Sequence, residues 1–328
     1  MDLKKSVLIA GTGKSGICAG ELLISKGAKI IFFDEDPKGE VDVAKILAKF
    51  PTDLDIRVEL KVLPEDILDE VGYMVLSPGI SIEAPFVERV IAKGIPVYSD
   101  IELAYQFSKG EIAAITGTNG KTTTTSLVGA IMEAYNPHTY VVGNIGIPYT
   151  MVVNDTTEDS SIVAEISSFQ LEAIEQFRPK VSALLNLTPD HLNRHHTMEI
   201  YGDTKLKIAI NQTEDDVIIL NYDDELVRPM ATRVQARVVF FSRLEQLEEG
   251  ICMKNGVITL IVNHEEIPFF KPEELKLLGG HNIENVMAAI GITYFMGVDV
   301  DTIKKICLTF SGVEHRIEYV AEKNGVVY

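Results

Sequence analysis

The sequence has few cysteines and no long apolar run. Its three cysteines, Cys18, Cys252 and Cys307, lie far apart, and their odd number argues against a disulfide framework or a cysteine-based zinc site. No stretch approaches the roughly 20 apolar residues that span a bilayer. The apolar run near the start is interrupted by Gly11 and Gly13, too early for the core of a secretory signal. We therefore expect a cytoplasmic protein in a reducing compartment.

Basic residues are also scarce, because 30 lysines and arginines stand against 48 aspartates and glutamates in 328 residues. A surface of this charge repels nucleic acid and anionic membranes, so neither is expected as a partner. A polyanionic ligand would need a local site that supplies positive charge. The length is sufficient for roughly two domains.

The stretch from Ile112 to Ser126 predicts a phosphate site. Its apolar start indicates a buried strand, Gly117 to Thr122 a turn, and the remainder the beginning of a helix. Such a turn directs backbone N–H groups, a helix N-terminus and the Lys121 side chain at one point, which attracts phosphate. The usual P-loop pattern has its first glycine where Ile115 stands here, so this loop is a variant. The alternative is a glycine-rich turn with an exposed lysine.

A second glycine-rich turn lies near the N-terminus. Ser6 to Ala10 predicts a strand and Gly11 to Gly16 a turn, and Asp34 ends the strand that follows. This layout is typical of a Rossmann nucleotide site, in which the acidic residue binds a ribose or a base. The loop with Gly79 follows a further strand end, where ligands gather in a parallel sheet. The alternatives are a turn without a ligand and a dehydrogenase site for a nicotinamide cofactor.

Three strands in the second half of the chain end in polar residues. Tyr140 to Val142 is followed by GNIG, Ser161 to Ile166 carries Glu165 near its end, and Val181 to Leu185 leads into NLTPDH, which ends at His191. The carboxyl ends of parallel strands meet at one edge of a sheet. We therefore expect all three ends to face the variant P-loop.

The rest of the chain continues the alternation of strands and helices. A small β meander is expected from Gly250 to Pro268, turned at Asn255-Gly256. We predict an α/β protein with a Rossmann-like N-terminal domain over residues 1–99 and a central P-loop domain, with a mostly parallel sheet, over residues 100–312. Residues 313–328 would be the stub of a third domain, since the hairpin expected from Glu318 is cut at Tyr328.

The chemistry of these residues suits ATP. If the loop binds the β- and γ-phosphates, Lys121 contacts their oxygens and the Thr122 hydroxyl binds a divalent ion. Glu165 is the natural second ligand of that ion, and His191 is a candidate ligand of a further ion. The alternative for Glu165 is an acid that caps the next turn, and the alternative for His191 is a surface histidine without a role. The spacing of His191 and His195 would also suit zinc, although an arginine between them disfavours it.

More than one cation would help a carboxylate to attack a phosphoryl group. Two anions must then meet, and each unit pair at ~4 Å costs about 4 kcal/mol at an effective dielectric constant of 20. A tenfold change in rate corresponds to only about 1.4 kcal/mol. Cations that bridge the two partners would offset the repulsion.

A series of motifs, in this order, resembles the Mur ligases, the ATP-dependent amide-forming enzymes of peptidoglycan precursor synthesis. The motifs are TGTNGKTT at 116–123, GNIG at 143–146, EISSFQLE at 165–172, TPDH at 188–191, YGDTKLKI at 201–208, GGHNIENVMAA at 279–289 and EHRIE at 314–318. The motifs SSFQLE, SPGI at 77–80 and GTGKSG at 11–16 look most like the branch of the family that adds D-glutamate. The resemblance covers the whole chain.

The resemblance implies a reaction and its ligands. The terminal carboxylate of UDP-N-acetylmuramoyl-L-alanine takes the γ-phosphoryl group of ATP, and the amino group of D-glutamate then displaces phosphate from the acyl phosphate. The implied ATP-binding residues are Gly117, Thr118, Asn119, Gly120, Lys121, Thr122, Asn282, Asn285 and Arg316. The implied substrate-binding residues are Lys14, Ser15, Asp34, Gly79, Asn144 and His191. The implied ligands of two Mg²⁺ ions are Thr122, Glu165, His191 and Lys205, and the implied catalytic residues are Lys121, Lys205, His191 and Glu165. Two of these residues have alternatives: Asn282 could cap its helix, and Arg316 could be a surface charge.

Lys205 enters this set only through the resemblance. From the sequence alone it would be an exposed helix lysine, one turn from Tyr201. Family members carbamylate the matching lysine, which then bridges to magnesium. CO₂ adds only to a neutral amine, and with an ordinary pKa near 10.4 roughly one lysine in a thousand is neutral near pH 7. Lys207 lies on another face of the helix and is the weaker candidate.

Family members also have a third, C-terminal domain, which supplies the D-glutamate site, and this chain ends a few residues into it. We therefore expect a chain that folds and binds the uridine substrate but lacks measurable ligase activity. Phosphate release at ordinary enzyme rates, about 1 to 10³ per second, would contradict this. The alternatives are another Mur ligase, which adds a different amino acid, and a non-catalytic uridine-nucleotide-binding protein. We expect a monomer.

Overall fold

The computed structural model describes residues 3–36, 38–277, 279–312, 322–323 and 326–327. Packing divides the chain into two compact units. The first comprises Met1–Gly110, Val142–Asp159 and Ile166–Phe177, and the second comprises Glu111–Val141, Ser160–Glu165 and Arg178–Tyr328. These units are defined by packing and do not test the domain boundary predicted at residue 99, which stays a prediction. They place the helix that follows residue 99 in the first unit.

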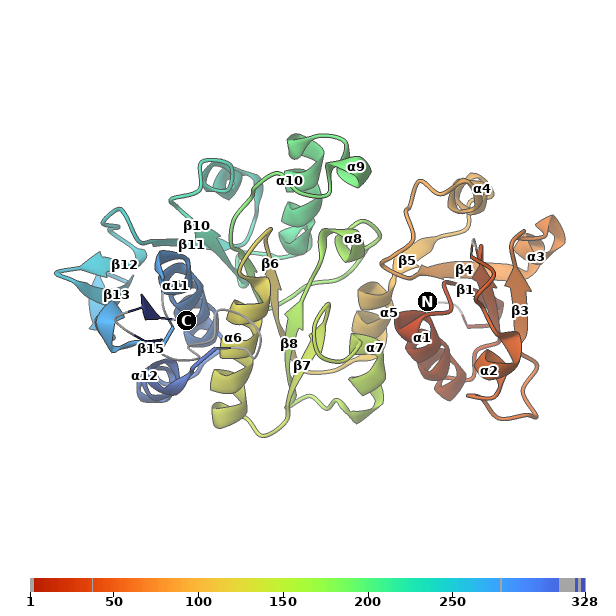
Figure 1. Cartoon of the computed structure of the whole chain (residues 1–328), viewed down its shortest axis with the longest axis horizontal. Helices are drawn as coiled ribbons and strands as arrows, with labels where there is room; N and C mark the ends of the chain where they lie inside the picture. Colours follow the sequence, from red (N-terminus) through yellow and green to blue (C-terminus); the bar gives the residue numbers. More distant parts are fainter. Residues whose placement is uncertain (1–2, 37, 278, 313–321, 324–325, 328) are drawn as a thin grey trace. The chain divides into compact units, whose positions relative to one another are not determined.

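The first unit is built on a five-stranded parallel sheet in the order β3-β2-β1-β4-β5 (Figure 1). Its central strand, β1 (Ser6–Ala10), is buried along its whole length, as expected for a strand covered on both faces. The other strands are β2 (Ile30–Asp34), β3 (Arg57–Leu60), β4 (Val71–Leu76) and β5 (Val97–Ser99). The helices are α1 (Lys14–Ser25), α2 (Val43–Leu47), α3 (Glu65–Glu70), α4 (Pro85–Ala92), α5 (Asp100–Phe107), α7 (Tyr149–Val152), which a 3₁₀ turn follows, and α8 (Ser168–Leu171).

The second unit carries most of a nine-stranded sheet in the order β14-β13-β12-β11-β10-β9-β6-β8-β7. The strands are β6 (Glu111–Thr116), β7 (Thr139–Gly143), β8 (Ser161–Glu165), β9 (Val181–Leu184), β10 (Val217–Asn221), β11 (Arg237–Ser242), β12 (Gly250–Lys254), β13 (Val257–Val262) and β14 (Glu265–Pro268). The pairs from β8 through β6, β9, β10 and β11 to β12 are parallel, and β12, β13 and β14 form antiparallel pairs. The turn between β12 and β13 has positive φ at Asn255 and Gly256, the combination that favours this dipeptide in hairpins.

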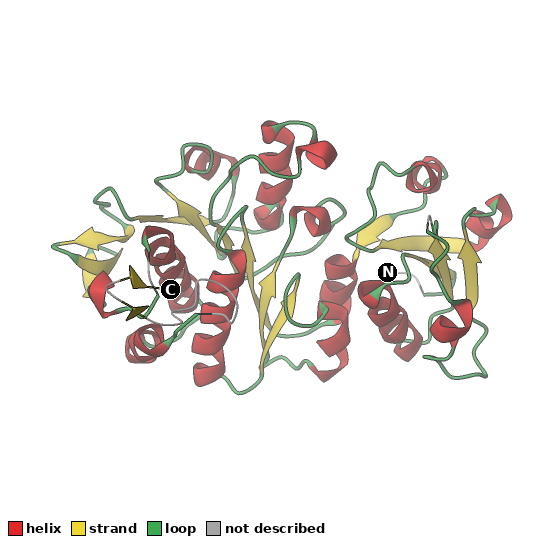
Figure 2. Cartoon of the chain, in the orientation of Figure 1, coloured by secondary structure: helices red, strands yellow, loops and turns green. Residues whose placement is uncertain are grey.

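The helices of the second unit are α6 (Lys121–Tyr135), α9 (Leu192–His195), α10 (Met198–Leu206), α11 (Gly280–Phe295) and α12 (Val300–Thr309). Helix α11 lies beside α6 and packs on the sheet (Figures 1 and 2). A run of its residues, from Asn285 to Thr293, is buried, and many of them belong to one apolar core with α6 and the central strands. This core fixes α11 next to the turn that precedes α6.

The predicted α/β architecture, with a mostly parallel sheet and a terminal meander, is confirmed. The helix expected from Met198 to Asn211 ends at Leu206 and continues as a 3₁₀ turn over Lys207–Ala209. The expected C-terminal hairpin is described only as β15 (Glu322–Lys323) paired with β16 (Val326–Val327), and Arg316 lies outside the described residues. No helix in the described part of the chain is long and apolar enough to cross a membrane.

Candidate nucleotide and metal site

The variant P-loop connects β6 to α6 through two glycines that no other residue could replace without strain. Gly117 has φ 150° and Gly120 has φ 81°, in the region that side-chain-bearing residues avoid. A Cβ atom on Gly117 would lie 3.0 Å from the Leu185 Cβ, and one on Gly120 would lie 2.2 Å from the Asn285 Oδ1. The loop is therefore pressed against both β9 and α11, and Lys121 begins the helix directly after it.

Gly120→Ala is expected to weaken ATP binding at least tenfold and to lower the free energy of unfolding by about 1–2 kcal/mol, the usual penalty for a left-handed alanine. The new methyl group would also displace Asn285. Calorimetric titration with Mg-ATP and urea unfolding measure the two effects. Gly13→Ala is the matched control, because a Cβ there meets no atom within 4 Å. Equal ATP affinity in the two variants would contradict the expectation.

The loop after β9 holds the P-loop in place. The Asn186 side chain accepts a hydrogen bond from the Asn119 N–H (2.8 Å) and donates one to the Asn119 carbonyl (3.0 Å). The Thr118 N–H donates to the Asn186 carbonyl (3.0 Å), and the Thr188 N–H donates to the Thr118 hydroxyl (3.1 Å). Hydrogen bonds within the protein thus fix the shape of this turn. The sequence showed a polar strand end at Asn186 but not this role.

Two lysines converge on one carbonyl of the loop. Lys121 Nζ donates to the Gly117 carbonyl (2.9 Å) and to the Thr118 carbonyl (2.8 Å), and Lys205 Nζ donates to the same Gly117 carbonyl (2.8 Å). Lys205 is only 2% exposed and its Nζ lies 4.8 Å from the centre of the Tyr201 ring. The sequence-based reading of Lys205 as an exposed lysine is therefore wrong, because α10 packs this face against the P-loop.

Burial and, second to it, the positive charge of Lys121 lower the pKa of Lys205 to about 7, against the opposing effects of Asp190 and Glu165. Removal from water disfavours the charged ammonium form. At pH 7 about half of such amines are neutral, against about one in a thousand for an ordinary lysine. The structure therefore gives Lys205 the neutral form that reaction with CO₂ requires.

The predicted metal ligands differ in exposure. Glu165, at the end of β8, is 1% exposed and Thr122 is 8% exposed, whereas 48% of the His191 side chain is exposed. His191 Nε2 lies 3.4 Å from Asp190 Oδ2. His195 is buried, which lowers its pKa to about 4. No group of three His, Cys, Asp or Glu side chains is placed as a metal site in the described part of the chain.

This donor set nevertheless fits magnesium. Mg²⁺ prefers hard oxygen ligands, takes few of them from protein and completes its shell with water and phosphate. Thr122 and Glu165 supply a hydroxyl and a carboxylate oxygen at the carboxyl ends of neighbouring parallel strands, β6 and β8. Remaining ligands would come from His191, a nucleotide phosphate or a modified Lys205.

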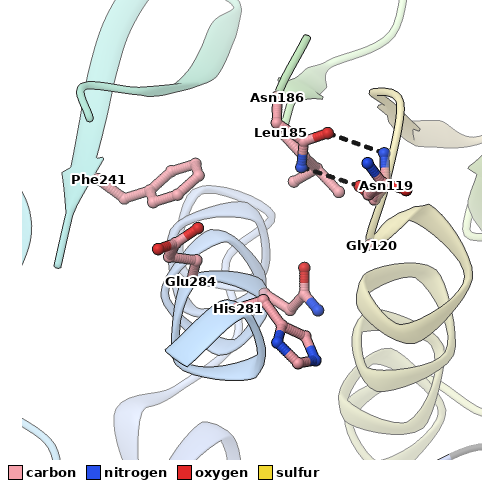
Figure 3. Close-up of a pocket in the computed structure, with 8 residues that line it drawn as sticks. Asn119, Gly120, Leu185, Asn186, Phe241, His281 and Glu284 are labelled. Carbon is pink, nitrogen blue, oxygen red and sulfur yellow. Dashed lines mark hydrogen bonds between the residues drawn. The ribbon is translucent and has the colours of Figure 1, made fainter. Parts of the chain in front are cut away.

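A cavity of about 360 Å³ opens beside the P-loop. Figure 3 shows it between the start of α6, the loop after β9 and the first turns of α11. Its lining consists of Asn119, Gly120, Leu185, Asn186, Phe241, His281, Glu284 and Asn285. The size falls in the range of small-molecule sites. The cavity is contiguous with the phosphate-binding turn, as a nucleoside triphosphate requires.

The two predicted asparagines of α11 lie together at this cavity. Asn285 lines it and donates to the Asn282 Oδ1 (3.1 Å), and both residues are buried. Sequence reasoning missed Phe241, His281 and Glu284. His281 and Glu284 belong to the motif at 279–289 that also contains both asparagines, whereas nothing in the sequence marked Phe241, which comes from a separate strand. Glu284 is paired with Arg243 at 2.9 Å.

The first unit brings most of the predicted uridine-site residues together. Asp34 Oδ2 accepts hydrogen bonds from the Thr12 N–H (2.9 Å) and hydroxyl (2.8 Å), so this acid shapes the glycine-rich loop. A Cβ on Gly11 would lie 2.7 Å from the Ser77 Oγ, so the loop before Gly79 touches the same turn. Lys14 and Ser15 begin α1 directly after it. Asn144 follows β7 and is exposed.

Comparison with known proteins decides the family. Residues 115–293 match the model of the Mur ligase middle domain, and residues 5–99 match that of the Mur ligase MurD-like, N-terminal domain. The chain belongs to the Mur ligase family. The resemblance seen in the motifs is thereby confirmed, and ATP is the nucleotide of this family.

Two relatives with high sequence identity to this chain have the same name. The UDP-N-acetylmuramoylalanine--D-glutamate ligase of Lachnoclostridium phytofermentans is 48% identical over 326 residues, which cover 99% of this chain and 71% of that protein. The ligase of the same name from Clostridioides difficile (strain 630) is 45% identical over 330 residues, which cover all of this chain and 72% of that protein. The chain thus spans about 71–72% of the length of these two Mur ligases.

Solved structures share the fold. A UDP-N-acetylmuramate:L-alanyl-gamma-D-glutamyl-meso-diaminopimelate ligase from Neisseria meningitides superposes with a TM-score of 0.58 at 16% identity, over 95% of this chain and 99% of that one. A UDP-N-acetylmuramate-alanine ligase from Thermotoga maritima superposes with a TM-score of 0.53 at 18% identity, over 98% of this chain and 71% of that one. At such identities the likeness shows the Mur ligase fold alone.

Proposed function

We propose that this protein acts in the D-glutamate-adding step, in which D-glutamate is joined to UDP-N-acetylmuramoyl-L-alanine at the expense of ATP. One observation carries the chemical part of the proposal: Lys121 and Lys205 meet at the Gly117 carbonyl, in the turn beside the nucleotide-sized cavity. An ammonium group at Lys121 and a lysine at Lys205 that can become a metal ligand suit the transfer of a phosphoryl group to a carboxylate, because the ammonium and the bound metal offset the repulsion between the two anions. The names of the relatives supply the choice of substrate.

The residues of the P-loop bind and orient ATP. Lys121 exchanges the carbonyls of Gly117 and Thr118 for oxygens of the β- and γ-phosphates. Asn119 keeps its backbone position because the Asn186 side chain bonds to both its N–H and its carbonyl. The ribose and base occupy the cavity against Asn285 and Phe241. Such positioning provides much of the catalysis in phosphoryl transfer.

Thr122, Glu165, His191 and a carbamylated Lys205 would hold two Mg²⁺ ions. Bound there, magnesium supplies positive charge to the phosphates and to the attacking carboxylate. Carbamylation changes Lys205 from a cation into an anionic oxygen ligand, directed at the same turn as Lys121. Lys121 would then be the remaining ammonium group at the phosphates.

The glycine-rich loop of the first unit would bind the uridine diphosphate part of the substrate. Lys14 and Ser15 begin a twelve-residue helix, whose N-terminal N–H groups favour a phosphate. Asp34 and the loop with Gly79 border this turn. Asn144 would contact another part of the same substrate. No nicotinamide cofactor is proposed, because the match over residues 5–99 is to a Mur ligase domain.

Calorimetric titration of the chain tests the substrate. We expect UDP-N-acetylmuramoyl-L-alanine to bind at least tenfold more tightly than UDP-N-acetylmuramate and than the product that already carries D-glutamate. Tightest binding of either comparison ligand would instead indicate another step of the same pathway. Absence of binding by all three would overturn the proposal for the first unit.

Lys121→Ala is expected to weaken ATP binding about 10- to 100-fold, because a hydrogen bond to a charged group contributes about 1.5–3 kcal/mol. Titration with Mg-ATP measures this, and binding of the uridine substrate should be unchanged. Lys305→Ala, an exposed lysine on α12, is the control and should bind ATP normally. ATP affinity that survives in Lys121→Ala would overturn the assignment of the phosphate site.

A further inference from the structure

Glu284 places a carboxylate in the wall of the nucleotide cavity. It belongs to the first turns of α11, and 25% of its side chain is exposed. It lines the cavity together with Phe241, and Figure 3 shows its carboxylate directed toward the Phe241 side. Small-molecule sites orient their ligands through a few polar groups among apolar ones. A charged group at this position is therefore a candidate for recognising part of the nucleotide.

An ion pair with Arg243 fixes this carboxylate. Arg243 Nε donates a hydrogen bond to Glu284 Oε1 at 2.9 Å. A Cβ atom on Gly280 would lie 3.4 Å from the Arg243 Cζ, so the guanidinium lies against the first turn of α11. The Arg243 backbone is itself anchored, because its N–H donates to Asp223 Oδ2 at 2.8 Å. The hydrogen bond from Arg243 uses Oε1 of Glu284, and Oε2 is the oxygen that it does not use.

The position of Glu284 corresponds to the base of a nucleotide bound at the P-loop. Asn285 touches that loop, since a Cβ on Gly120 would lie 2.2 Å from its Oδ1. Successive residues of a helix point about 100° apart, so Glu284 faces another direction, toward the loop after β11. Strand β11 is the third strand from β6 in the sheet, a distance of ~14 Å at about 4.8 Å per strand. With the phosphates at the P-loop, the base is the part of ATP that extends to this end.

The chemistry of this end of the cavity suits adenine. Phe241 and Leu185 provide apolar surface for a planar ring. Among the hydrogen-bonding groups on the edges of adenine, the exocyclic amino group is the donor. A carboxylate that is paired with a guanidinium accepts hydrogen bonds and donates none. Because Arg243 already binds Oε1, the cavity offers the amino group one acceptor, Oε2 of Glu284.

We propose that Glu284 is a specificity-determining residue, whose Oε2 accepts a hydrogen bond from the exocyclic amino group of adenine, and that Arg243 positions it. This inference rests on the proposed ATP site. A purine without the amino group would leave the carboxylate in the cavity without that donor. Sites built to hydrogen-bond a ligand group discriminate against analogues that lack it, because their own polar group then loses its partner.

Calorimetric titration with Mg-ATP and with Mg-purine riboside triphosphate, which lacks only the amino group, tests the role of Glu284. We expect the wild-type chain to prefer ATP about tenfold, the usual effect of a hydrogen bond to a charged group. Glu284→Ala should lose this preference by weakening ATP alone. Arg243→Ala should lower the preference to about threefold, half of its free energy, because the carboxylate is no longer held. Glu248→Ala, an exposed glutamate in the loop after β11, is the matched control and should keep the full preference.

The outcomes separate this role from other roles of Glu284. Equal weakening of both nucleotides in Glu284→Ala would show that the ion pair only stabilises α11, and would overturn the proposal. Mg-2′,3′-dideoxy-ATP should be weakened by Glu284→Ala as much as ATP, and an unchanged affinity for it would assign the carboxylate to the ribose instead.

The proposed ATP site and the role of Glu284 can fail separately. A wild-type chain that binds both purine nucleotides equally overturns the role of Glu284 and leaves the ATP site intact. A wild-type chain that binds neither overturns both. If Glu284→Ala does not fold, Glu284→Met, which keeps the length of the side chain without a carboxylate, decides by the same criteria.

Discussion

Exposure of this chain to carbon-13-labelled CO₂ is expected to label Lys205 and to leave Lys207 unlabelled. Lys205 is buried against the P-loop and its pKa is lowered to about 7, first by burial and then by Lys121. A neutral amine adds CO₂ and releases a proton to give the carbamate. Carbon-13 NMR of the labelled chain detects the product directly, without the removal of CO₂ that intact-mass measurement risks.

The labelling should rise with pH in a predictable way. The reactive form is the deprotonated amine, so with a pKa of about 7 its share rises from about one tenth at pH 6 to about nine tenths at pH 8. At a fixed concentration of dissolved CO₂ the initial rate of carbamate formation should therefore increase about ninefold over this interval, and the equilibrium signal should rise more steeply, because the reaction also releases a proton. An ordinary lysine would also gain with pH, but its neutral share would remain below about one in a hundred at pH 8.

Two variants test whether Lys205 is the lysine that carries the label. Lys205→Arg should abolish the signal, since the guanidinium stays protonated at these pH values. Lys207→Arg is the matched control two residues away and should keep it. A signal that survives in Lys205→Arg, or that disappears in Lys207→Arg, would show that the wrong lysine has been assigned. A wild-type chain without any signal at pH 8 would count against carbamylation in this protein.

Lys205 also shows where the sequence stops being informative. The variant P-loop could be predicted because all its determinants are local: a buried strand, two glycines that need positive φ, and a lysine that opens the next helix. Lys205 looked exposed because the polarity of α10 is spread around the helix. What buries it is the non-local contact of α10 with the P-loop, visible in the Tyr201 hydroxyl 3.3 Å from the Thr118 Oγ1.

The residues that line the cavity also divide into those that the sequence predicted and those that it did not. Asn119 and Gly120 were predicted from the loop itself, and Asn285 came from the resemblance to the Mur ligases. Phe241 and Glu284 complete the lining from β11 and α11, which meet only because the sheet order brings β11 to that side. Periodicity predicts that such strands and helices exist, but a single sequence does not say which of their side chains share a cavity.

Glu102→Ala is expected to lower the free energy of unfolding of the first unit by about 3–5 kcal/mol, because a donor left without its acceptor costs about 1–3 kcal/mol and several donors lose theirs. Glu102 lies in α5 and is completely buried. Its Oε2 accepts from the N–H groups of Glu175 and Phe177 (2.9 Å each) and of Gln176 (3.1 Å), and its Oε1 accepts from Gln106 Nε2 (2.8 Å). Three successive backbone donors would lose their acceptor.

Glu102→Gln tests whether the stabilisation depends on the negative charge of Glu102 or only on the size of its side chain. The amide keeps one acceptor oxygen but turns an NH₂ group toward N–H donors, so a loss of about 2–3 kcal/mol is expected, still larger than for most substitutions. Glu88→Gln on α4, an exposed glutamate of the same unit, should stay within about 0.5 kcal/mol of the wild type. Urea unfolding followed by circular dichroism compares the three variants. If Glu102→Gln unfolds at the same midpoint as Glu88→Gln, the carboxylate does not hold the segment that leads from α8 to β9.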